Sequence, residues 1–327
     1  MKGSMTAIST TELFAPIQEE LAAVKVRLHK TAQGQHDSLT TAAECLLNSG
    51  GKRIRPAISL LAAGMFKADF DHSVSLAAAV EMLHTATLVH DDMIDGALLR
   101  RGMPTLNAGW SPDVTVLMGD YLFARAASLV AQTNNLRIIN LFAETLIVIV
   151  NGEVKQKFSQ GNISRDDYYE RIYAKTAAMF VLSTEAAAML GNADAASLEA
   201  IGEFGRQVGM AFQIVDDVLD FIGESDQIGK PVGGDLRQGL FTLPAIYYAE
   251  AHPNDPDMNA LLNGHAGDRD IVPRVVKAVR ESDAIAAALR EAREFVARAQ
   301  LALTKVPDSP HAAALSALSH YIVDRSL

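Results

Sequence analysis

Residues 197–221 read SLEAIGEFGRQVGMAFQIVDDVLDF, a helical stretch that is apolar on most sides and ends in a cluster of acids. A helix with apolar residues all round belongs deep in the core of a protein. Its last turns carry the pattern Asp-Asp-x-x-Asp, formed by Asp216, Asp217 and Asp220. We therefore expect a central helix that carries three carboxylates within an otherwise apolar segment.

The same acidic pattern occurs a second time, as Asp91, Asp92 and Asp95, at the end of the apolar stretch 74–95. On a helix, positions i, i+1 and i+4 share one flank, so each triad presents its carboxylates in one direction. Like charges at this spacing repel unless cations offset them. Oxygen-only sites of this kind suit Mg²⁺, which completes its shell with waters and phosphate oxygens. The repeat predicts a metal-dependent diphosphate site, and chance acids on two solvated helix ends are the plain alternative.

The bulk composition limits the classes of function. The chain has 327 residues, of which 49% are hydrophobic, and a net charge of −10, which argues against nucleic-acid binding. Cys45 is the single cysteine, so an internal disulfide is excluded, and a small buried role in a reducing compartment is expected for it. No signal segment is visible, and the longest apolar run, 138–150, is too short to span a bilayer. We expect a cytoplasmic protein without stable membrane insertion, in which 138–150 is a buried core helix.

Nearly every long segment has the apolar spacing of a helix, and no run alternates well enough to form a strand. No linker is long or simple enough to separate two domains. We therefore predict an all-α fold, with residues 1–327 forming a single large helical bundle whose central helices are buried. The predicted helices are 13–28, one that begins near Pro56, 74–95, 114–130, 136–158, 166–190, 197–221, 271–281, 282–305 and 310–324.

Basic residues accompany the acidic triads. Residues 50–56, GGKRIRP, place Lys52, Arg55 and a third cation after a glycine turn at a helix start. Backbone N–H groups and the helix dipole add to that anion site. Arg100 and Arg101 follow the first triad, and their forked donors suit phosphate oxygens. A solvated basic turn and a charge-balancing loop are the competing interpretations.

Other polar residues lie inside apolar segments. Lys175 and Thr176 are within a predicted helix, where an unpaired lysine would be costly unless it reaches the surface. Gln213 precedes the second triad by three residues, and His84 precedes Asp91 by seven, near the same helix face. For Gln213 and His84, a hydrogen-bonded core residue is the competing interpretation.

In their order along the chain, these motifs resemble those of the trans-polyprenyl (isoprenyl) diphosphate synthases. The motifs are GGKRIRP (50–56), HTATLVHDDMID (84–95), RRG (100–102), GDY (119–121), GEV (152–154), KT (175–176), FQIVDDVLD (212–220) and GKP (229–231). The resemblance covers about residues 45–245. It implies an isoprenoid-synthase bundle around an active-site cavity, two or three Mg²⁺ ions, and a homodimer. It also implies a prenyltransferase that condenses isopentenyl diphosphate head to tail with an allylic diphosphate.

The resemblance further implies a role for each motif residue. The metal ligands would be the six triad aspartates, namely Asp91, Asp92, Asp95, Asp216, Asp217 and Asp220. The cations beside the allylic diphosphate would be Arg100 and Lys230, and those that hold isopentenyl diphosphate would be Lys52, Arg55, His84 and Arg101. The polar atoms of Lys175, Thr176 and Gln213 would face the developing allylic cation. Glu153 and Gln156 resemble positions that orient metal-bound waters.

One segment departs from the family pattern. Residues 235–240 read DLRQGL, where many relatives have Asp-Leu-x-Glu-Gly-Lys. Leu240 therefore stands in place of a family lysine, while Lys230 and Arg237 are present. This leaves open how many lysines close over the allylic diphosphate, although it leaves the reaction class unchanged.

Product length can be argued from helix geometry. A prenyl tail that grows from Asp91 would run back past Thr87, Ala86, Leu83 and Val80, a span of roughly 16 Å. Ala86 and Thr87 are small, whereas short-product relatives usually have aromatic residues there. The resemblance therefore favours an all-trans product of medium or long chain, such as a quinone side-chain precursor. A short farnesyl or geranylgeranyl product is the alternative.

Two further classes compete with this interpretation. A class I terpene cyclase also ionises an allylic diphosphate, but it usually lacks the second Asp-rich triad and the basic residues for isopentenyl diphosphate. A regulatory subunit of a heteromeric synthase, or a helical interaction protein, usually lacks one triad or the basic residues. Both triads and the basic residues are present in this chain.

Overall fold

A computed structural model describes residues 10–33, 36–48, 51–100, 102–158, 164–223, 232–264 and 270–324. Helices form most of this part of the chain. Its strands are the two-residue segments β1 (Leu99–Arg100) and β2 (Met103–Pro104), which pair antiparallel. The predicted all-α class is confirmed, and the small hairpin is an addition that the sequence did not indicate.

The helices follow one another along the whole chain. Those of the first half are α1 (Thr10–Leu13), η1 (Ala15–Ile17), α2 (Gln18–Ala32), α3 (Asp37–Asn48), α4 (Ile54–Met65), α5 (Phe70–Ile94), α6 (Leu106–Gly109), α7 (Pro112–Ala131) and α8 (Leu136–Phe158). Those of the second half are α9 (Arg165–Ile172), the π-helical turn η2 (Tyr173–Ala177), α10 (Ala178–Leu190), α11 (Ala195–Ile222), α13 (Gly234–Arg237), α14 (Leu243–Ala251), α15 (Pro256–Leu262), α16 (Ile271–Glu281), α17 (Ala284–Leu303) and α18 (Pro310–Asp324).

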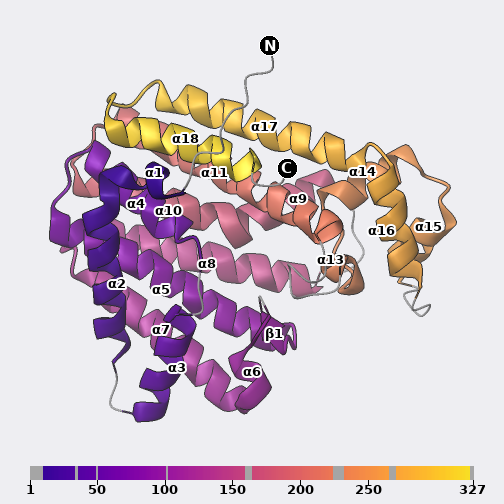
Figure 1. The fold of residues 1–327 in the computed structure, drawn as a ribbon, viewed down its shortest axis with the longest axis horizontal. Helices are drawn as coiled ribbons and strands as arrows, with labels where there is room; N and C mark the ends of the chain where they lie inside the picture. The colour runs from indigo at the N-terminus through magenta and orange to yellow at the C-terminus, as the bar shows by residue number, and fades with distance from the viewer. Residues whose placement is uncertain are drawn as a thin grey trace.

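The long helices lie in layers. In Figure 1, α5, α8, α10 and α11 cross the middle of the view, with α17 and α18 along the upper side. The most extensive helix pairs are α5 with α7 and α11 with α17, and α11 also packs along α10. Sixteen residues of α11 are buried, from Ser197 to Phe221, so the prediction that this helix lies in the core is confirmed.

The predicted helix 166–190 is interrupted. The structure divides it into α9, the π-helical turn η2 and α10, so that Lys175 and Thr176 lie in the widened turn. Turns of this kind are rare and are found frequently at functional sites. Periodicity could not indicate the turn, because most residues of α10 are buried and the helix has no distinct polar face whose shift would mark an extra residue.

Close helix packing holds η2 in place. A Cβ added at Gly209 of α11 would lie 2.5 Å from the Cα of Ala177, and one added at Gly152 of α8 would lie 2.5 Å from the Cβ of Ala174. Real side chains do not approach so closely, so only glycine fits at both positions. The two glycines thus let η2 pack directly between α8 and α11.

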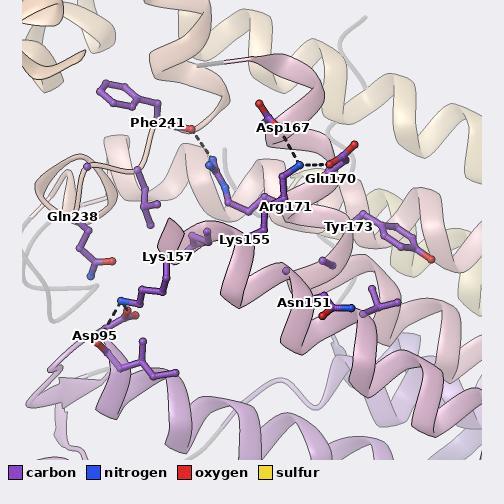
Figure 2. Close-up of a pocket in the computed structure, with 17 residues that line it drawn as sticks. Asp95, Asn151, Lys155, Lys157, Asp167, Glu170, Arg171, Tyr173, Gln238 and Phe241 are labelled. Atoms are coloured by element: carbon purple, nitrogen blue, oxygen red, sulfur yellow. Dashed lines mark hydrogen bonds and ion pairs between the residues drawn. The ribbon is translucent and has the colours of Figure 1, made fainter. Parts of the chain in front are cut away.

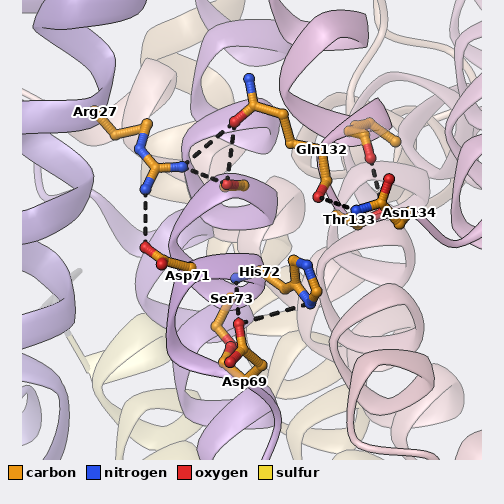
Figure 3. A network of polar contacts seen from close by, with 10 residues as sticks. Arg27, Asp69, Asp71, His72, Ser73, Gln132, Thr133 and Asn134 are labelled. Carbon is orange, nitrogen blue, oxygen red and sulfur yellow. Dashed lines mark hydrogen bonds and ion pairs between the residues drawn. The ribbon is translucent and has the colours of Figure 1, made fainter.

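A polar network fixes the N-terminal end of α5 (Figure 3). The Arg27 guanidinium on α2 donates hydrogen bonds to Ser75 Oγ at 2.5 Å and Asp71 Oδ1 at 3.1 Å. It also donates to Gln132 Oε1, just after α7, at 3.4 Å. Asp71 and Asp91 are separated by about 30 Å along α5. This network therefore anchors the end of α5 that is far from the acidic triad.

Two predictions about burial are wrong. Cys45 is exposed. In α8, which contains the run 138–150 expected in the core, the buried residues are only Ile138, Phe142, Thr145 and Ile149. Most of the remaining surface of α8 is open although much of it is apolar, and this exposed face bears on assembly.

One helix of the described chain, α7, is long and apolar enough to cross a membrane by length and composition. It packs along α5, and 39% of the apolar stretch is buried within the bundle. A core helix of a globular bundle passes the same test of length and hydropathy.

Candidate active site

In each acidic triad, the middle carboxylate is buried and the two outer carboxylates are more accessible. The middle members are buried, with Asp92 7% exposed and Asp217 4% exposed. Asp216 is exposed, Asp91 and Asp220 are half-buried, and the side chain of Asp95 is 25% exposed. The outer members of a triad are four residues apart, which places them on one face of the helix. Two accessible carboxylates and one enclosed carboxylate therefore come from each triad.

Arg100 holds the enclosed carboxylate of the first triad. Its Nε donates to Asp92 Oδ1 at 2.8 Å, and its Nη2 is 2.8 Å from the same oxygen. Arg100 lies in β1, so the hairpin after α5 folds back over the triad. The arginine that was predicted to act on phosphate is therefore engaged by Asp92 in this structure.

Two neutral donors hold the enclosed carboxylate of the second triad. Gln213 Nε2 donates to Asp217 Oδ1 at 2.8 Å, and the Tyr168 hydroxyl donates to Oδ2 at 2.7 Å. Thr176 Oγ1 in turn donates to Gln213 Oε1 at 2.6 Å. Burial raises the pKa of Asp217 well above its usual value, against the lowering effect of these hydrogen bonds. The predicted candidates Thr176 and Gln213 are thus brought together, and Tyr168 is a member that the sequence did not single out.

The pKa of Asp91 reflects the crowding of charge at the site. Burial is the main reason that the pKa rises from 3.8 to about 6, and the neighbouring Glu153 and Asp95 raise it further. The positive charges of Lys175 and Arg100 act in the opposite direction. Deprotonated Asp91 therefore sits in an environment that favours an additional cation.

Lys175 acts electrostatically on the first triad and on an acid beside the second. Its Nζ is 3.4 Å from Glu153 Oε1. Burial lowers its pKa, but the negative charges of Asp91, Glu153 and Asp95 outweigh that effect, and the pKa is raised. The same ammonium lowers the pKa of Asp235, which lies beside the second triad. The lysine was predicted at the site, and its charge acts on two acids of the first triad and on Asp235 beside the second.

Asp235 is a further acid of the site that the sequence did not indicate. Its pKa is raised to about 7, mainly by burial and then by the charges of Asp220 and Asp216. The backbone N–H groups of Gly234 and Asp235 donate to the Asp220 carboxylate at 3.1 and 3.3 Å. These bonds draw α13 onto the end of α11. In the sequence, Asp235 is the first residue of the segment 235–240. Nothing in the apolar periodicity indicates that this segment packs against α11, so the sequence could not place Asp235 at the site.

Three of the four residues predicted to hold isopentenyl diphosphate, Lys52, Arg55 and His84, line one cavity of about 490 Å³ together with Arg100. Lys52 and Arg55 come from the start of α4, His84 from α5, and Arg100 from the hairpin. Arg55 Nη1 is 3.2 Å from His84 Nε2, and its guanidinium stacks over the rings of Phe180 and Phe212. Chain segments that are far apart in sequence thus form one basic cavity.

Lys52 and Arg53, in the turn before α4, each have a protein partner in this structure. Lys52 Nζ donates to the Tyr321 hydroxyl at 2.9 Å, which ties the turn before α4 to α18. Arg53 adopts a left-handed backbone conformation with φ 49° and forms an ion pair with Glu81 at 2.7 Å. Of the three cations in GGKRIRP, Arg53 is thus used to hold the turn. Arg101 and Lys230 lie outside the described residues.

The donor set fits a hard divalent cation that keeps part of its water shell. In the described part of the chain, no group of three or more His, Cys, Asp or Glu side chains is arranged to hold a metal alone. Mg²⁺ is usually bound by one or two carboxylates together with waters and substrate phosphates. The outer carboxylates Asp91, Asp95, Asp216 and Asp220 could supply these oxygen ligands. Burial raises the pKa of Asp91, so its charged form would gain from a cation bound beside it.

Known proteins of one family match nearly the whole chain. The family model described as polyprenyl synthetase matches residues 36–279. The heptaprenyl diphosphate synthase component 2 of Geobacillus stearothermophilus is 35% identical, covering 96% of this chain and 98% of its own. The all-trans-nonaprenyl-diphosphate synthase (geranyl-diphosphate specific) of Rhodobacter capsulatus is 34% identical, covering 96% and 97%. A crystal structure of a Caulobacter crescentus polyprenyl synthase, complexed with calcium and isoprenyl diphosphate, aligns with a TM-score of 0.92 at 34% identity, covering 98% and 99%.

Proposed function

Because the chain belongs to the polyprenyl synthetase family, we propose that it condenses isopentenyl diphosphate with an allylic diphosphate to form an all-trans polyprenyl diphosphate. The chain is a prenyltransferase. The names of its relatives support a product of medium or long chain rather than a short one. The observation that carries the proposed mechanism is Lys175, whose charge acts on Asp91 of the first triad and on Asp235 beside the second. An ammonium that acts on the first triad and on an acid beside the second supports the proposal that both triads face one site for a diphosphate.

The accessible carboxylates would hold two or three Mg²⁺ ions on the allylic diphosphate. Asp91, Asp95 and Asp216 are the main proposed ligands, and Asp92, Asp217 and Asp220 assist them. When bound, the metal ions neutralise the diphosphate and so make it a better leaving group. The positive charges of Arg100 and Lys230 would bind further oxygens of the leaving diphosphate.

The remaining polar residues have proposed roles that fit their positions. Lys52, Arg55, His84 and Arg101 would hold isopentenyl diphosphate, and the first three line the basic cavity. The oxygens near the developing allylic cation would be those of Thr176 and Gln213. The bond from Gln213 to Asp217 and the bond from Thr176 to Gln213 keep them oriented. No protein nucleophile is required, and the departing diphosphate is the proposed base for the final proton. The site thereby stabilises charge through fixed groups that need little reorganisation.

An assay of the purified chain tests this function. We expect turnover with Mg²⁺, labelled isopentenyl diphosphate and an allylic primer, and no turnover without isopentenyl diphosphate. Conversion of the allylic diphosphate alone into a cyclic hydrocarbon would identify a terpene cyclase instead. Turnover that appears only after a second protein is added would identify one component of a heteromeric enzyme, as the name of the Geobacillus relative indicates for that protein.

We also propose that the enzyme is a homodimer formed through α8. The residues of α8 that are at least half exposed and strongly apolar are Leu136, Ile147, Val150, Val154 and Phe158. The last four recur at spacings of three or four residues and form an apolar stripe on the C-terminal half of the helix, which is typical of an interaction surface. A second copy fits this surface, because a two-fold axis pairs the same apolar patch on both subunits. A cytoplasmic location is consistent with one exposed cysteine and is part of the proposal.

Substitution of the stripe tests the dimer. We expect Val150→Glu to convert the protein to a monomer in sedimentation equilibrium, because a buried unpaired carboxylate opposes association. Leu301→Glu, at an exposed apolar position of α17, should leave the dimer intact. A wild-type protein that sediments as a monomer at micromolar concentration would show that this face binds a different partner.

A further inference from the structure

A second cavity, of about 530 Å³, opens beside the first acidic triad. Asp95 lines it at one side, and α8, α9 and residues 238–241 form the other walls (Figure 2). Three cations line it as well, namely Lys155, Lys157 and Arg171. The cavity therefore combines a proposed metal ligand with positive charge, the two requirements of a site for a metal-bound diphosphate.

Two of the three cations are engaged away from the triad. Lys155 Nζ forms ion pairs with Asp167, at 3.0 Å, and with Glu170. Arg171 Nη2 donates to the carbonyl oxygen of Phe241 at 2.6 Å. These contacts fix α9 against its neighbours, and they occupy both side chains.

Lys157 is oriented toward the triad. Figure 2 shows its side chain extending from α8 to Asp95, and the Nζ is 3.8 Å from Asp95 Oδ1. The same Nζ lies 3.5 Å from the carbonyl oxygen of Ile94, in the last turn of α5. The side chain is 47% exposed, so it has room to move. An ammonium on a flexible four-carbon stem can follow a charge that changes position within its reach.

Leu240 lines the same cavity as Lys157. This is the position at which the resembling family carries a lysine, and leucine provides no charge there. Lys157 comes from a different wall of the cavity and brings a cation to the same space. Lys157 can therefore supply a cation in the cavity where Leu240 supplies none.

We propose that Lys157 binds the diphosphate of the allylic substrate and supplies the charge that Leu240 lacks; this inference rests on the proposed function. In the protein without substrate, the ammonium neutralises Asp95. Once a divalent cation takes that role, the ammonium is released to a diphosphate oxygen in the same cavity. Charge-assisted hydrogen bonds of this type are among the strongest in proteins.

Binding of inorganic pyrophosphate in the presence of Mg²⁺, measured by titration calorimetry, tests the proposal without turnover. We expect Lys157→Gln to weaken binding by about tenfold, the usual effect of losing one hydrogen bond between charged groups. Lys155→Gln is the matched control, two residues away in the same cavity, and it should change binding less than twofold. Adding Leu240→Lys to Lys157→Gln should restore most of the lost affinity.

The outcomes separate this inference from the proposed function. If Lys157→Gln binds pyrophosphate as tightly as the wild type, or if Lys155→Gln weakens binding equally, Lys157 has no specific role. If the wild type itself binds no pyrophosphate with Mg²⁺, both the inference and the proposed diphosphate site are wrong. Circular dichroism of each variant confirms that the fold is intact, which a half-exposed residue in the last turn of α8 should allow.

Discussion

Asp91→Asn is expected to lower kcat by about 10²–10³-fold or more, while making the metal-free protein more stable at pH 8. The catalytic loss follows because an amide cannot supply the negative ligand that holds a divalent cation on the leaving group. The gain in stability follows from the raised pKa of Asp91, about 6, which shows that its charged form is unfavourable in the folded protein. The two effects of one substitution thus have opposite signs.

The pH dependence of the stability gain follows from linkage. The pKa of Asp91 is 3.8 in an unfolded chain and about 6 in the folded one, a value that already includes the attraction of Lys175. The folded state therefore loses stability as the pH rises from about 4 through 6, and the full cost is present above that range. Replacing the carboxyl with an amide removes a cost of roughly 1–3 kcal/mol at pH 8 and almost none at pH 4.

Thermal unfolding with and without Mg²⁺, together with steady-state kinetics, measures both effects. The wild type should gain stability from Mg²⁺ at pH 8, whereas Asp91→Asn should gain much less, because metal bound only to the folded state stabilises it by mass action. Asp308→Asn, at an exposed position between α17 and α18, should change neither quantity. Wild-type kcat in Asp91→Asn would show that Asp91 is not a required metal ligand. Loss of activity and stability together would show that Asp91 instead belongs to the framework of the fold.

Much of the fold could be predicted because α11 and α5 have unambiguous patterns. Long apolar segments with acidic ends indicated both helices, and the helices 136–158, 271–281 and 310–324 were located to the residue. Burial was harder to predict, because an apolar run has the same composition in a core as at a subunit contact. The exposed apolar residues of α8 are an example, because the sequence alone does not show whether such residues are buried in the core or lie on the surface.

The site was predictable wherever residues formed a local pattern, and less so where contacts depended on tertiary packing. The triads, Lys175, Thr176 and Gln213 were identified from spacing and family resemblance, and the last two share a hydrogen bond. Tyr168 reaches Asp217 across 49 positions of sequence, and Asp235 belongs to a separate short helix. Neither partnership leaves a trace in periodicity, because only the packing of α9 and α13 onto α11 creates it.

Ala86→Phe is expected to shorten the product from a medium or long polyprenyl chain to a short one. If the growing tail extends from Asp91 back along α5, Ala86 is met after about 7–8 Å. A phenyl ring at this point would fill the space that later isoprene units need. Elongation would stop early, while ionisation of the primer at the triads would continue.

Because Ala86 is buried, a shorter product must be distinguished from simple destabilisation of the fold by the larger side chain. Ala86, Leu83 and Val80 are all fully buried, so a phenyl ring needs either a tunnel or a displaced core. Overpacking of a filled core typically costs 1–3 kcal/mol. A tunnel would accept the ring at a smaller cost, because the space is reserved for substrate. Melting temperature and product length together therefore decide between the two cases.

A graded series gives the sharpest test of this tunnel. Products of the wild type, Ala86→Leu and Ala86→Phe are separated by reversed-phase chromatography after removal of the diphosphate. Chain length should fall with side-chain size in that order, with the initial rate of primer consumption nearly constant. Identical product lengths in a folded Ala86→Phe variant would place the tail elsewhere in the bundle. A lower melting temperature with unchanged length would show that Ala86 packs the core, because a side chain that does not meet the tail cannot determine where elongation stops.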